Sequence, residues 1–153
     1  LGLVGSEMCI RDSFDSKFPE ANFKEDYYRF SKILIGVGDA KGADQNMGLK
    51  HELIAMKNPY IMSSSNEFSV QLLFNGQPQK NKKITIFERK TDKTVGVRTA
   101  LTDSNGISKF TVTQGNEYLI DNVILELNNK PKNDTFWTSY WAALTFRVSN
   151  EPQ

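Results

Sequence analysis

Every second residue from Phe68 to Phe74 is large and apolar, and apolar residues alternate in the same way at 142–148. A period of two buries one face of an extended strand, whereas an amphipathic helix needs apolar residues three or four positions apart. Shorter apolar runs recur between turn sequences about every 8–12 residues, and no long stretch has the helical period. We therefore predict an all-β chain that folds as an antiparallel β-sandwich of about eight strands. A closed barrel has the same strand spacing and is the alternative.

Glycine, asparagine and aspartate mark the ends of several predicted strands. The β-favouring residues at 28–37 predict a strand that ends at Gly36–Gly38. The sequence Thr102–Gly106 (TDSNG) predicts a hairpin, because Asp103 can cap local amides and the Asn-Gly pair tolerates positive φ.

The chain has the length of one ordinary domain. With 153 residues, of which 39% are hydrophobic, it can bury a core of its own. We assign a single β-sandwich domain to residues 27–148 and a tail to 149–153. We expect residues 1–26, which precede the domain, to consist of an artefact followed by an irregular segment. The string Gly5–Ser13 (GSEMCIRDS) resembles a translated sequencing adaptor, so we expect residues 1–13 to be foreign and the natural N-terminus to be missing.

Composition and motifs exclude several classes of function. A formal charge of +1 leaves no basic excess for a nucleic-acid backbone, and no apolar run approaches the roughly 18 residues of a membrane span. One cysteine and one histidine exclude an internal disulfide and a Cys/His zinc cluster. No Gly-x-Ser-x-Gly elbow, phosphate-binding loop or complete dinucleotide fingerprint occurs. We therefore predict that the protein is not an enzyme and has no firmly bound cofactor.

The histidine, His51, is the one candidate metal ligand of the imidazole type. A neutral imidazole suits nickel, copper and zinc, and Glu52 beside it could add a carboxylate oxygen. On an extended strand the two side chains point to opposite faces, so they cannot share an ion without a bulge. The competing and preferred interpretation is a solvated strand histidine with no ligand.

Three aromatic residues, Trp137, Tyr140 and Trp141, are the candidate ligand-binding residues. They could form a stacking platform for a sugar or a peptide. Because Trp141 immediately precedes the alternating strand at 142–148, closure of the end of the core is the preferred interpretation.

Several sequence runs together resemble one known family. They are Arg29–Leu34 (RFSKIL), Gly48–Ile54 (GLKHELI) with Asn58-Pro59, Phe68–Pro78 (FSVQLLFNGQP), Thr102-Asp103 with Gly106 and Phe110, Gly115–Tyr118 (GNEY), and Trp137–Phe146 (WTSYWAALTF). The order and spacing of these runs, from Arg29 to Val148, are similar to the DUF4198 family. The resemblance implies an immunoglobulin- or transthyretin-like sandwich.

The same resemblance implies a function in metal uptake. Members of this family look like periplasmic or secreted accessory components of nickel and cobalt uptake, so a nickel or cobalt ion is the implied ligand and a membrane metal transporter the implied partner. The metal is expected near a mature N-terminal histidine that this chain lacks, which leaves only His51 and Glu52. The alternative hypothesis is a metal-independent envelope or surface module that binds a polysaccharide or a protein.

Overall fold

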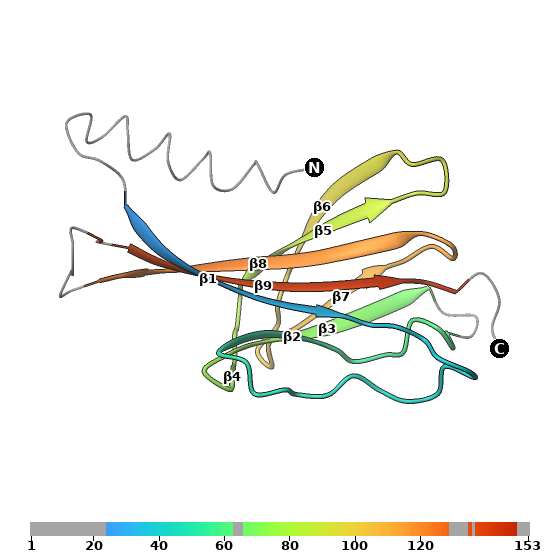
Figure 1. Ribbon diagram of the computed structural model, residues 1–153, viewed down its shortest axis with the longest axis horizontal. Helices are drawn as coiled ribbons and strands as arrows, with labels where there is room; N and C mark the ends of the chain where they lie inside the picture. The colour runs from blue at the N-terminus through green and yellow to red at the C-terminus, as the bar shows by residue number, and fades with distance from the viewer. Residues whose placement is uncertain (1–23, 63–65, 129–134, 136, 150–153) are drawn as a thin grey trace. The chain divides into compact units, whose positions relative to one another are not determined.

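The protein is all-β, as the alternation of apolar residues predicts. The computed structural model describes residues 24–62, 66–128, 135 and 137–149, and these contain nine strands and no helix (Figure 1). No helix that could cross a membrane is therefore present in this part of the chain. The predicted artefact at residues 1–13 lies outside the described residues. The strands are β1 (Glu25–Ile33), β2 (His51–Ala55), β3 (Glu67–Phe74), β4 (Gln77–Pro78), β5 (Lys83–Arg89), β6 (Val95–Leu101), β7 (Ile107–Thr111), β8 (Glu117–Leu127) and β9 (Trp137–Arg147).

The strands form two sheets. The first, sheet A, has five strands in the order β1-β9-β8-β5-β6. The second, sheet B, has β2 on one side of β3, while the short β4 and β7 both pair with β3. The pairs β2–β3, β3–β7, β5–β6 and β5–β8 are all antiparallel. The architecture is that of the predicted sandwich. It has one strand more than the eight predicted, and the additional strand is the two-residue β4.

Apolar side chains from both sheets meet in one core. The ring centroids of Phe68 on β3 and Phe146 on β9 lie 4.4 Å apart, and the Phe146 ring also stacks on Tyr118 of β8. Full burial of each such side chain stabilises the fold by roughly 1.5–3 kcal/mol. The core also contains the residues predicted from the alternating strands: Val70, Leu72, Ala142, Leu144 and Val148.

The turn at 102–106 forms, but the prediction of a hairpin is wrong. Asp103 accepts hydrogen bonds from the backbone N–H groups of Asn105 and Ile107, as its capping role requires. However, β6 before the turn belongs to sheet A and β7 after it to sheet B, so the turn carries the chain across the sandwich. Local turn chemistry does not encode which sheet the next strand joins.

The first strand begins and ends earlier than predicted. Strand β1 ends at Ile33, and residues 34–50 continue as an irregular segment, the 34–50 loop, instead of extending the strand to Gly36–Gly38. The loop bonds to β2, whose five residues are buried on both faces. This covering is the reason that β2 has no polar, solvated face.

The chain divides into two compact units. One comprises Leu1–Tyr27 and Leu125–Ser139, and within it the Asn128 side-chain amide donates to the Thr135 carbonyl at 3.3 Å. The other comprises Tyr28–Ile124 and Tyr140–Gln153 and contains the whole core described above. Except for Trp137, every site residue considered below belongs to this second unit.

Candidate functional site

His51 is buried, and the expectation of a solvated strand histidine is wrong. Its exposed fraction is 0%, and its ring packs edge-on against Phe74 with 5.6 Å between centroids. The Nδ1 atom lies 2.9 Å from the Tyr140 carbonyl oxygen. A carbonyl only accepts, so the neutral ring carries its proton on Nδ1 and presents a bare lone pair at Nε2.

The Nε2 atom of His51 has no hydrogen-bond partner among the described residues, and neither has Oδ1 of the buried Asn122. The Asn122 amide nitrogen donates to the Lys83 carbonyl at 2.8 Å, which fixes the orientation of that side chain. Burial lowers the pKa of His51 to about 4, although the Tyr140 carbonyl and the Asn122 side chain favour the protonated form. His51 is therefore neutral at physiological pH.

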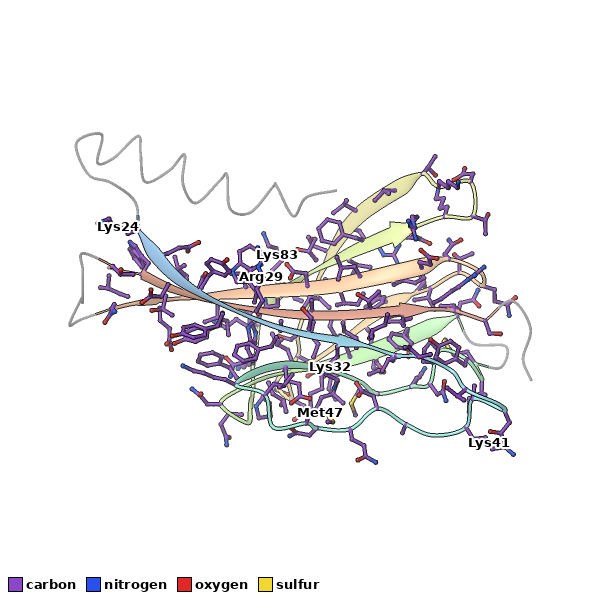
Figure 2. All side chains as sticks on the ribbon, in the orientation of Figure 1. Lys24, Arg29, Lys32, Lys41, Met47 and Lys83 are labelled. Atoms are coloured by element: carbon purple, nitrogen blue, oxygen red, sulfur yellow. The ribbon has the colours of Figure 1, made fainter. Side chains whose placement is uncertain are left out.

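Glu52 serves a structural role that occupies both of its oxygens. Oε1 accepts from Lys32 Nζ at 3.0 Å and from the Met47 N–H at 2.8 Å, while Oε2 accepts from the Leu49 N–H at 3.1 Å. Lys32 also contacts Asp44 at 2.9 Å, and Asp44 in turn accepts from the backbone N–H of Ala55 on β2. Figure 2 shows Lys32 reaching from β1 toward the loop that carries Met47. This buried cluster, Lys32–Asp44–Glu52, fastens the 34–50 loop to β2.

The predicted ligand pair does not fit a nickel or cobalt ion. His51 and Glu52 are consecutive residues of β2, and they bond to different surroundings on its opposite faces, as the strand geometry predicts. Within the described residues no group of three His, Cys, Asp or Glu side chains could hold a metal ion. A firmly bound transition metal needs three or four such donors.

The predicted aromatic residues are not gathered on one face. Tyr140 and Trp141 are consecutive on β9 and both are buried, Tyr140 stacking on Tyr28 and packing against Phe74. Trp141 lies under the guanidinium of Arg29, 5.1 Å from ring centroid to Cζ. Trp137 is half-buried and belongs to the first unit. Tyr140 and Trp141 thus pack on opposite sides of sheet A.

A pocket that the sequence did not reveal lies at the 34–50 loop. It has a volume of about 440 Å³ and is lined by residues 33–37, residues 40–45, Met47, Asn58 and Tyr60. Its lining is mixed: Lys41, Asp44, Gln45 and Asn58 contribute to it. Four other lining residues are apolar and largely exposed, because Ile33, Ile35, Val37 and Met47 are 65–79% exposed. We refer to these four residues as the apolar rim. Such a cluster of exposed apolar side chains is typical of an interaction site.

Two side chains that follow β2 hold the pocket open. The Asn58 amide donates to the carbonyls of Ala40 and Gly42 at 2.7 and 3.0 Å. The Tyr60 hydroxyl donates to the Leu34 carbonyl at 2.7 Å, and its ring lies so close to Gly36 that a Cβ there would sit 3.0 Å from it. The loop conformation is therefore set by long-range contacts, not by a local sequence pattern.

Comparison with models of known families gives a match to this chain. A family model described as "Domain of unknown function (DUF4198)" matches residues 12–124 of this chain. The matched range includes β1 to β7 and therefore all the residues that line the pocket. A search of curated proteins gives no significant match.

Proposed function

Because this chain belongs to the DUF4198 family, whose function is unknown, we propose a function from the geometry of the pocket. The protein is a non-catalytic β-sandwich module that binds an extended segment of a partner protein at the 34–50 loop. The observation that carries the proposal is the pocket of about 440 Å³ with its apolar rim of Ile33, Ile35, Val37 and Met47. Binding would bury side chains that the isolated chain leaves in water.

The lining of the pocket favours a peptide over a polysaccharide. Sugar sites need polar groups beside an exposed aromatic face, whereas the rim is aliphatic and the Tyr60 ring is half-buried against Gly36. Several polar groups of the lining are already engaged, because Asn58 donates to the carbonyls of Ala40 and Gly42, and Asp44 pairs with Lys32. An aliphatic side chain of the partner segment, inserted between Val37 and Tyr60, is the ligand that this lining suits.

Among the described residues a metal ion would lack the three or four donors that it needs, because both Glu52 oxygens already accept hydrogen bonds and no group of three donors includes His51. If the uptake role implied by the family resemblance holds, the membrane transporter would contact this module through such a peptide segment. The proposal needs no metal ion at His51.

The test is a selection of displayed random peptides on the full chain, followed by affinity measurements with the synthetic peptides. We expect selected peptides to carry an aliphatic anchor and to bind about tenfold or more weakly to Ile35→Asp. The matched control is Val95→Asp, because Val95 is also an exposed apolar residue but lies on β6, away from the pocket lining. Peptides that bind equally to both variants, or a selection that yields none, would refute the proposal.

A further inference from the structure

Strand β6 leaves one edge of sheet A open in the described part of the chain. It is the last strand in the order β1-β9-β8-β5-β6 and pairs with β5 only (Figure 1). The seven residues Val95–Leu101 include no proline and one charged residue, Arg98. Native proteins usually protect such an edge with charges, prolines or a covering segment, because it can pair with another strand.

The free hydrogen-bonding groups of β6 can be assigned from its bonds to β5. At the ends of the strand pair, Thr102 N donates to Lys82 O at 3.0 Å and Lys90 N donates to Thr94 O at 2.9 Å. In an antiparallel pair, bonded positions alternate with non-bonded ones, so the even-numbered residues of β6 bond to β5. The backbone groups of the odd-numbered residues therefore point to the free edge. These residues are Val95, Val97, Thr99 and Leu101.

The side chains of the same four residues are exposed and uncharged. Val95, Val97 and Leu101 are 59%, 60% and 62% exposed, and Thr99 is exposed with them on the outer face of sheet A. The one charged side chain, Arg98, is directed to the other face, where it pairs with Glu88 on β5 at 2.8 Å and donates to the Thr111 carbonyl. No charge on the open edge thus opposes the approach of an identical strand.

We propose that two copies of this chain pair through β6 in an antiparallel, two-fold symmetric manner, which joins their A sheets into one. In the register centred on Val97, each Val97 faces its counterpart, and Val95 faces the partner's Thr99. Opposed pairs of this kind exchange two backbone hydrogen bonds each. Because β6 is used in both copies, the interface is closed and does not propagate into a fibre.

The position of Gly96 favours this register over the one centred on Arg98. Arg98 then lies opposite the partner's Gly96, which has no side chain, so the two guanidinium groups are kept apart. A register centred on Arg98 would place this residue opposite the partner's Arg98. Like charges that face each other across a strand pair are destabilising.

The first test is sedimentation of the full chain over a concentration series. We expect the wild type to form a species of twice the chain mass, and Val97→Lys to lose it, because the two lysines would meet on the symmetry axis. Val97 is 60% exposed, so the variant should keep the fold of the single chain. The matched control, Val37→Lys, changes an exposed valine of the apolar rim and should dimerise normally. A wild type that stays monomeric, or a dimer that Val97→Lys leaves unchanged, overturns the proposal.

The second test reads the register by disulfide formation in a Cys9→Ser background. Opposed residues of a bonded pair lie about 5.5 Å apart at Cα, which a disulfide can bridge. Val97→Cys should therefore cross-link two chains on oxidation, whereas Val95→Cys alone should not, because its counterpart is Thr99. Cross-linking of Val95→Cys in preference to Val97→Cys contradicts the proposed interface. Since Val95, Val97 and Thr99 are not among the residues that line the pocket, the outcome is independent of the proposed peptide binding.

Discussion

Two buried residues, His51 and Asp121, have pKa values that are shifted in opposite directions from the ordinary values of these groups. Burial lowers the pKa of His51 from 6.5 to about 4 and raises that of Asp121 from 3.8 to about 6, the latter despite the nearby charge of Arg29. In both cases the low-polarity surroundings penalise the charged form, which is cationic for histidine and anionic for aspartate. Their effects on stability therefore have opposite signs.

The signs follow from proton uptake on unfolding. Between pH 6.5 and 4 unfolding lets His51 take up a proton, so its contribution to stability is lost as the pH falls. Between pH 6 and 3.8 the folded protein holds a proton on Asp121 that the unfolded chain releases, so the contribution of Asp121 is lost as the pH rises. We expect these two contributions to offset each other in the wild type over the same pH range.

Single substitutions should reveal how each residue makes the free energy of unfolding depend on pH. In Asp121→Asn the His51 contribution is uncompensated, so the free energy of unfolding should fall on acidification from pH 6.5 to 4, on the order of 2 kcal/mol more than in the wild type. In His51→Gln it should rise on acidification relative to the wild type. Urea unfolding at a series of pH values measures both slopes, which are independent of any constant loss of stability. Parallel profiles for all three proteins would falsify the two assignments.

At the scale of elements, the 34–50 loop depends on the buried cluster Lys32–Asp44–Glu52. Removal of the lysine charge in Lys32→Met leaves two buried carboxylates without a cation, which should cost about 3 kcal/mol or more. The two carboxylates accept hydrogen bonds from the N–H groups of Met47 and Ala55, so hydrogen exchange at these two groups should accelerate in the variant. The matched control is Lys41→Met on the same loop: Lys41 pairs with Asp39 in full contact with water, so no measurable change in stability is expected.

The turn between β6 and β7 provides a second test at this scale. Gly106 and Gly76 both have positive φ, 71° and 73°, which costs a residue with a Cβ about 1–2 kcal/mol. A Cβ at Gly106 would also lie 2.8 Å from the Leu72 carbonyl oxygen, whereas one at Gly76 would meet nothing within 4 Å. We expect Gly106→Ala to lower the free energy of unfolding clearly more than Gly76→Ala in chemical denaturation. Equal losses would show that the close approach to β3 is unimportant.

The sequence predicts these elements unequally, for physical reasons. The strand at 67–74 was predictable because one face enters the core, which leaves a period of two in the residues Phe68–Phe74. The 34–50 loop was not, because the contacts of Asn58, Tyr60 and Glu52 that shape it come from residues distant in the sequence. His51 is buried on the opposite face of β2, against Phe74 and the Tyr140 carbonyl, so the solvated state expected for an isolated polar residue did not apply.

At the scale of the whole molecule, the sandwich was predictable but its site was not. Alternation on several strands indicates that two sheets face each other, yet which sheet receives β7 after the turn at 102–106 depends on packing against β3. The pocket arises from an irregular loop with no motif, whereas the rare residues of the sequence, His51 and the tryptophans, stand out as candidate ligands. His51 and Trp141 are rare in the sequence, but here their packing explains their positions.

The described part of the chain offers few ligands to a transition metal. His51 offers one lone pair at Nε2, Glu52 already accepts three hydrogen bonds, and the described residues hold no group of three donors. We therefore expect that calorimetric titration with Ni²⁺ or Co²⁺ gives the same weak isotherm for the wild type and for His51→Ala. Cys9→Ser is the matched control for the one thiol of the chain. A tight one-to-one site that disappears in His51→Ala, but not in Cys9→Ser, would contradict this prediction. It would mean that Nε2 recruits ligands by a rearrangement of the buried surroundings of β2, and metal binding would then displace peptide binding as the preferred function.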